Sequence, residues 1–219
     1  MTPDFYLPYL LNYSQPAAEE IVIFVIAMLT AIIVSAEGQG FAATFLGDAQ
    51  IGGKDRFHFN VFKHMSILGT LNFFVAGFGW AKEIDIDTGN FKNHPRLFLV
   101  LSRLAGPISN LVMANIAASL SWVLGKYNFE DKVFSTIVVV NVTMAVYGLI
   151  MVSPLPGSAL LFACLPDGEF FDKVKKTICT LGPYLIIGTF LFIRLNGWEG
   201  LSSFFNPIVA TITAFILDL

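Results

Sequence analysis

The chain has 219 residues, of which 55% are hydrophobic and 13% are charged, and its net charge is −3. Soluble domains carry about 25% charged residues, so this composition excludes an ordinary soluble domain and predicts a protein built for lipid. The 13 Lys and Arg residues form no basic tract of the kind that binds nucleic acid, and we expect no nucleic-acid partner.

The segment before the first apolar run, residues 2–16, is rich in Pro and Tyr. It lacks the basic start and the small-residue cleavage site of a signal peptide. We therefore expect the first apolar run to remain in the mature protein as a membrane span.

Long apolar runs then follow one another along the chain, separated by short polar connections. A membrane-spanning helix needs about 20 mostly apolar residues. The runs near this length are residues 20–46, 65–82, 97–125, 132–153, 177–195 and 201–217. The pattern predicts an all-α integral membrane protein with roughly six transmembrane helices in a single domain, residues 1–219. The stretch 157–166 is too short to span and would form a half-helix after Pro156.

Basic residues flank both ends of the short, Gly-rich run 65–82. They are Lys54, Arg56 and Lys63 before it, and Lys82, Lys92 and Arg96 after it. Because short loops rich in Lys and Arg stay on one side of a membrane, a simple crossing by this run is awkward. Two interpretations remain open, a re-entrant or broken element and an ordinary short helix with one basic loop on the unfavoured side.

Residues 83–90 alternate acidic and apolar side chains and end in Thr-Gly-Asn, while residues 56–60 alternate in a similar way. Such period-two patterns ending in a turn are typical of short strands. We expect the two segments to pair as a small β element at the membrane surface.

Short motifs in the first half of the chain carry a family resemblance. They are Leu-Gly-Asp at 46–48, Phe-Asn-Val-Phe-Lys-His at 59–64 with Gly-Thr-Leu at 69–71, Phe-Gly-Trp-Ala-Lys at 78–82, and Asn-Phe-Lys-Asn at 90–93 with Leu-Ala-Gly-Pro-Ile-Ser-Asn at 104–110. Together they resemble the site-2 protease family, the intramembrane zinc metalloproteases, and most closely its compact prokaryotic members.

This resemblance implies a site-2-protease-like core over about 20–165, with additional spans over about 177–217. It also gives a structural role to the residues of the matching motifs, which include Lys63, His64, Gly69, Trp80, Lys82, Gly106, Pro107 and Asn110.

The resemblance also locates the family's chemistry, a His-Glu-x-x-His helix whose histidines bind zinc and whose glutamate activates water. An ungapped reading back from residues 46–48 puts Ser35 and Gln39 at the histidines and Ala36 at the glutamate, and the family's aspartate ligand falls on Pro156. Because zinc needs about three nitrogen, sulfur or carboxylate donors, the resemblance implies the fold without the activity, and we expect no metal and no cofactor.

Two ionisable residues lie within the apolar runs near these positions. Glu37 lies well inside the first run and Arg103 lies early in the third. Charged residues within membrane spans are by default functional and paired, so we expect Glu37 and Arg103 to form an ion pair in the vacated zinc position. The alternatives are a hydrated, inert Glu37 beside Gly38 and an Arg103 that reaches the interface.

The sequence therefore predicts a catalytically inactive site-2-protease-like protein that acts as a structural or binding subunit of a membrane complex. We expect it in the plasma (inner) membrane of a prokaryote, with an energy-transducing assembly as one candidate host. Its expected partners are the lipid bilayer and other membrane subunits, with lipid or pigment as candidate ligands. One alternative is an active, diverged zinc metalloprotease that uses Glu37 with His64 or His94. Another is a transporter or proton path through the former active-site cavity, with Glu37 as the carrier.

Overall fold

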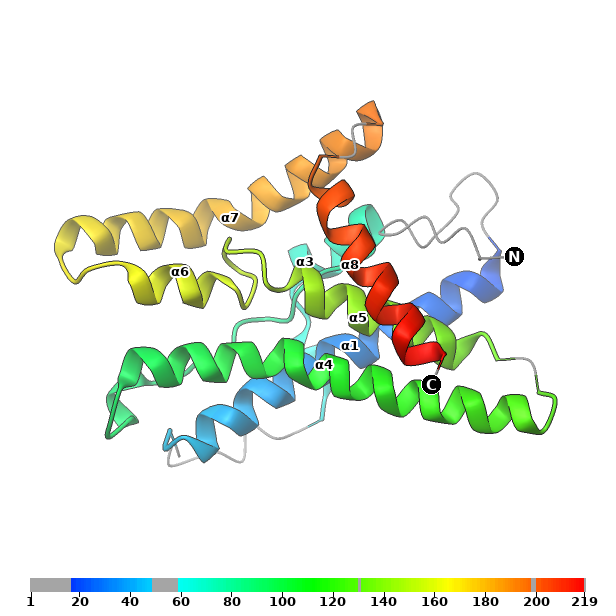
Figure 1. Cartoon of the computed structure of the whole chain (residues 1–219). Helices are drawn as coiled ribbons and strands as arrows, with labels where there is room; N and C mark the ends of the chain where they lie inside the picture. Colours follow the sequence, from blue (N-terminus) through cyan, green and yellow to red (C-terminus); the bar gives the residue numbers. More distant parts are fainter. Residues whose placement is uncertain (1–16, 49–58, 130, 198–199, 219) are drawn as a thin grey trace.

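The computed structural model in Figure 1 describes residues 17–48, 59–129, 131–197 and 200–218. Its helices are α1 Ala18–Phe45, α2 Val61–His64, α3 Ile67–Ala76, α4 Pro95–Lys126, α5 Val133–Tyr147, α6 Ser158–Cys164, α7 Glu169–Asn196 and α8 Gly200–Leu217, with a 3-10 turn, η2, at Thr88–Asn90. Within these ranges the chain contains no β-strand, and its only bridge is an isolated antiparallel one between Met65 and Ala81. The predicted all-α class is confirmed.

Among the described helices, four are long and apolar enough to cross a membrane, and they are α1, α4, α7 and α8. The predicted count of roughly six spans is not reproduced, because α3 has 10 residues and α5 has 15 residues. At 1.5 Å per residue these two helices are about 15 Å and 22 Å long, and the hydrocarbon core of a bilayer is about 30 Å thick. The predicted half-helix after Pro156 is present as α6.

Helix α5 is the centre of the bundle. Residues 137–147 of α5 are all buried, and a helix that is apolar all round belongs inside a protein or a membrane. In Figure 1, α5 lies between α1 and α4 on one side and α8 on the other, and it contacts all three. Because α5 is surrounded by protein, its length is not set by the thickness of the bilayer.

Two glycines allow α1 and α4 to pack closely. A Cβ added to Gly38 of α1 would overlap the side chain of Ser109 on α4. A Cβ added to Gly106 of α4 would lie 2.7 Å from Ser35 Oγ and 2.9 Å from Gln39 Nε2 on α1. Small residues let membrane helices approach closely, and here each helix provides one glycine to accommodate the other.

A backbone hydrogen bond joins the two ends of the run 65–82, so that the chain leaves and returns at the same place. Helix α3 ends at Gly77, whose φ of 79° is left-handed, as is common for a glycine after a helix. The chain then turns back, and the Lys82 N–H donates to the His64 carbonyl at 2.6 Å beside the Met65–Ala81 bridge. Since the two ends lie side by side, this geometry favours the re-entrant interpretation, and it explains why basic Lys63 and Lys82 flank both ends.

An aromatic cluster joins this returning segment to the last two long helices. The ring of Tyr147 on α5 lies 4.4 Å from Phe78, 5.7 Å from Phe190 of α7 and 5.2 Å from Phe205 of α8, measured between centroids. The Tyr147 hydroxyl donates to Asn206 Oδ1 at 2.7 Å. Contacts of this kind hold α7 and α8 to the bundle core through large buried surfaces.

The predicted β element is wrong for the segment that the structure describes. Residues 83–87 form no strand and lead into η2, while the proposed partner segment lies largely outside the described residues. Asp48, just after α1, holds this segment through its side chain. Its carboxylate accepts from the Asp87 N–H at 3.0 Å and from Asn90 Nδ2 at 2.7 Å.

The close packing at Gly38 predicts that one added methyl group lowers the stability of the protein. We expect Gly38→Ala to destabilise the protein by about 1–3 kcal/mol, the usual range for overpacking, measured by unfolding in mild detergent. The double variant Gly38→Ala with Ser109→Gly should recover most of this loss, because the side chain that the methyl group meets is removed. The control is Gly188→Ala in α7, where an added Cβ meets nothing within 4 Å. An equal loss at both glycines would contradict the packing.

Candidate functional site

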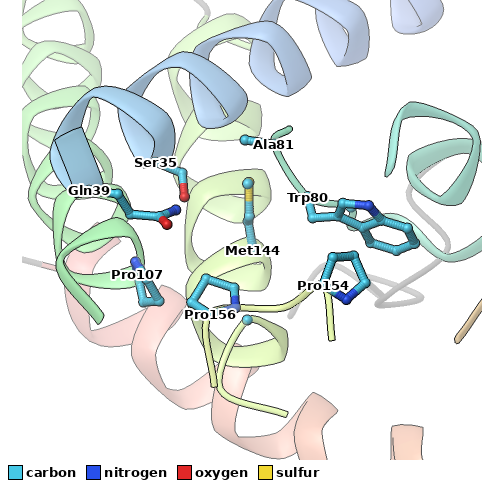
Figure 2. Close-up of a pocket in the computed structure, with 10 residues that line it drawn as sticks. Ser35, Gln39, Trp80, Ala81, Pro107, Met144, Pro154 and Pro156 are labelled. Carbon is cyan, nitrogen blue, oxygen red and sulfur yellow. The ribbon is translucent and has the colours of Figure 1, made fainter. Parts of the chain in front are cut away.

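The positions that the resemblance assigns to the zinc ligands meet in one small pocket. Ser35 and Gln39, one turn apart on α1, face Pro156 from the loop after α5 (Figure 2). The full lining consists of Ser35, Gln39, Gly79, Trp80, Ala81, Pro107, Met144, Gly148, Pro154 and Pro156. Residues far apart in sequence are thus brought together at the positions where the resemblance expects a metal centre.

Little empty space remains in the pocket. Its volume is about 10 Å³, and a water molecule needs roughly 10–15 Å³ by the same measure. Figure 2 shows the Met144 side chain of α5 beside Gln39, and Pro107 and Pro156 line the same pocket. Ala36, at the position of the family's glutamate, is fully buried and carries only a methyl group.

A cation stands beside the pocket. Arg103 Nη1 donates to Gln39 Oε1 at 3.2 Å, so the amide oxygen at one of the positions that the resemblance assigns to a histidine already has a positively charged partner. Zinc takes histidine nitrogen, cysteine sulfur or carboxylate oxygen. The hydroxyl of Ser35, this occupied amide and the ring of Pro156 therefore do not fit a zinc ion.

Glu37 lies on the other face of α1. Successive residues of an α-helix are about 100° apart, which places Glu37 about 200° around α1 from Ser35. Its Oε1 accepts from the Phe59 N–H at 3.1 Å and lies 3.1 Å from His64 Nε2. Within the part of the chain that the structure describes, Glu37 Oε2 is buried and has no hydrogen-bond partner.

The expected pair of Glu37 with Arg103 is therefore replaced by two other contacts, Glu37 with His64 and Arg103 with Gln39. The helical period places Glu37 on the opposite face of α1 from Gln39, which the sequence could show. Only the structure shows that Arg103 of α4 lies on the Gln39 side. Glu37 is not among the residues that line the pocket, so the geometry gives no support to a proton path through it.

The remaining motif residues lie where elements meet. Lys63 and Lys82 are exposed at the two ends of the returning segment. A side chain on Gly69 would overlap the Trp80 carbonyl oxygen, so only glycine fits there. Gly106 and Pro107 adjoin the pocket from α4. Asn110, also on α4, is buried, and its side-chain nitrogen and oxygen have no partner among the described residues.

Met144 is a pocket residue that no sequence motif indicated. Its contribution depends on how α5 packs against α1, which no local pattern encodes. In the described ranges no group of three or more His, Cys, Asp and Glu side chains is close enough to hold a metal ion. His94, exposed just before α4, belongs to no such group there.

Comparison with known proteins gives one informative relative. The chain is 31% identical over 153 residues to a Bacillus subtilis (strain 168) protein named "Putative zinc metalloprotease YwhC", and the match covers 66% of this chain and 69% of the relative. The chain therefore belongs to the zinc metalloprotease family of that relative, which fits the resemblance to the site-2 proteases. No family profile matches the chain, and no solved structure matches it.

The contact between Gln39 and Arg103 predicts a measurable coupling. In a double-mutant cycle with Gln39→Leu and Arg103→Met, we expect a coupling energy of about 1–2 kcal/mol, since hydrogen bonds to charged groups are worth more than neutral ones. The free energy of unfolding in mild detergent provides the readout. A control cycle with Ser35→Ala and Arg103→Met should give less than about 0.5 kcal/mol. Coupling of Arg103 to Glu37→Gln instead would show that the assigned partners are wrong.

Proposed function

We propose that this chain is a membrane protein that retains the architecture of an intramembrane zinc metalloprotease without its peptide-bond chemistry. It acts as a structural or binding subunit of a membrane complex. The single observation that carries the proposal is the pocket itself, in which Ser35, Gln39 and Pro156 converge and Arg103 binds Gln39. Prolines line the space where proteolysis would require a metal and its water, and the Arg103 guanidinium lies beside it, bound to Gln39.

The outer helices support the binding part of the proposal. Helix α7 contacts chiefly α3, and several of its large apolar side chains are exposed, among them Tyr184, Leu185 and Leu195. On α8, Phe204 and Phe215 are 66% and 68% exposed. Large aromatic and aliphatic surfaces of this kind are suited to lipid or to the helices of other membrane subunits. We place this complex in the plasma membrane of a prokaryote.

A second candidate is favoured by two observations, the name of the relative and the contact between Glu37 and His64 at 3.1 Å. In this candidate, the chain is an active metalloprotease whose ligands have moved to the other face of α1. Glu37 and His64 provide one carboxylate and one imidazole, and a catalytic zinc takes about three protein ligands. A third ligand would have to join them.

Zinc analysis separates the two candidates. We expect the purified full chain to carry far less than one zinc per chain after equilibration with zinc and removal of the unbound metal, and His64→Ala to leave this value unchanged. One zinc per chain in the native protein, lost in His64→Ala, would establish the second candidate instead. The measurement is elemental analysis of detergent-purified protein, with a fold check by size-exclusion chromatography.

The subunit role has its own test. Affinity capture of the tagged full chain from membranes solubilised in mild detergent should recover other membrane proteins in fixed ratio to it, as measured by quantitative mass spectrometry. Substitutions that place charges on the exposed face of α7, such as Leu185→Asp, should reduce that recovery, whereas the same change at exposed Leu120 of α4 should not. Recovery of the chain alone would contradict the proposed role.

A further inference from the structure

A groove runs between α1 and α4 on the face of α1 opposite the pocket. It consists of two adjoining hollows of about 310 Å³ and 360 Å³, which share Glu37, Phe59 and Ser109 as lining residues. Apart from Glu37 and Ser109, the lining is apolar or glycine. Unlike the pocket at Ser35, this groove is large enough for part of a small molecule.

The two hollows lie at different depths. The inner one is lined by Ile33 and Val34 of α1 and by Val112, Met113 and Ile116 of α4. The outer one lies nearer the end of α1 at Phe45 and the start of α4 at Pro95. Glu37 stands between them, about two helical turns or 12 Å before the end of α1. The groove therefore presents one polar position near a membrane surface and an apolar channel directed toward the bilayer centre.

Glu37 has an unmet requirement for a hydrogen-bond donor. Its Oε1 is engaged by the Phe59 N–H and by His64, whereas its Oε2 is buried and has no partner in the described part of the chain. Buried polar atoms are almost always hydrogen-bonded, and a carboxylate oxygen is an especially strong acceptor. A ligand in the groove can supply the missing donor.

The missing donor at Glu37 Oε2 restricts the chemistry of that ligand. An ionised fatty acid or a phosphate diester offers acceptors and no donor, which disfavours both here. A hydroxyl group donates one hydrogen bond and carries no charge. The apolar hollow beyond it suits a flexible hydrocarbon tail.

We propose that the groove binds a long-chain membrane alcohol, an uncharged amphiphile with one hydroxyl head and one apolar tail. The hydroxyl donates to Glu37 Oε2, and the tail lies along Ile33, Val112 and Ile116. This site does not depend on the proposed function, because it lies on the other face of α1 from the pocket and uses none of the residues aligned with the zinc ligands.

The test compares two probes that share one tail. Radiolabelled hexadecanol and hexadecanoate are titrated onto the purified full chain in mild detergent at a pH where the acid is ionised. We expect hexadecanol to bind saturably at one molecule per chain and hexadecanoate to bind at least about tenfold more weakly. Glu37→Gln, which keeps the shape of the side chain and removes its charge, should weaken hexadecanol binding by about tenfold.

Matched tryptophan variants test the position of the tail. Ile116 and Leu120 lie one turn apart on α4 and are 50% and 43% exposed, but only Ile116 lines the groove. Ile116→Trp should abolish saturable binding and Leu120→Trp should leave it unchanged, with both variants matching the native chain in thermal unfolding. Equal binding of the alcohol and the acid, or alcohol binding that survives both Glu37→Gln and Ile116→Trp, would overturn the proposal, whatever the zinc content of the protein.

Discussion

The close approach of α1 and α4 is the contact on which the rest of the structure depends. Gly38 of α1 accommodates Ser109, and Gly106 of α4 accommodates Ser35 and Gln39. A larger residue at either glycine would push the two helices apart. On one face of α1 this contact closes the pocket against Pro107 and Pro156. On the other face it leaves a groove beneath Glu37. One helix pair thus separates a small, nearly filled pocket from an open groove.

The sequence predicted the helices that face lipid more accurately than those that face protein. The expected runs 20–46 and 97–125 correspond closely to α1 and α4, because apolar runs of that length are the direct signal of a span. The run 132–153 is apolar because α5 is the buried core of the bundle, and apolarity alone cannot separate these two environments. Of the two interpretations left open for the run 65–82, the structure favours the re-entrant one, because Gly77 ends α3 and the Lys82 N–H donates to the His64 carbonyl.

At the site, the sequence showed which residues align with the family's zinc ligands, but it did not show which side chains contact one another. Ungapped counting placed Ser35, Gln39 and Pro156 at one centre, and the structure brings those three residues into one pocket. Arg103 was paired with Glu37 because both are ionisable residues within apolar runs. In the structure the turn of α1 directs Gln39 toward Arg103 and Glu37 toward His64. The contact of Glu37 with His64 joins α1 to α2 across 27 positions of the sequence, and no local pattern encodes it.

The central claim is that this chain has kept the geometry of a metal centre while losing its donors, and restoring the donors tests it most directly. The variant combines Ser35→His, Gln39→His and Pro156→Asp with Arg103→Ala, which removes the neighbouring cation. The measurement is zinc per chain in purified, folded protein. We expect close to one zinc for the variant and far less for the native chain, since three suitable ligands would then converge. A folded variant without zinc, or a native chain that already carries one zinc per chain, would contradict it.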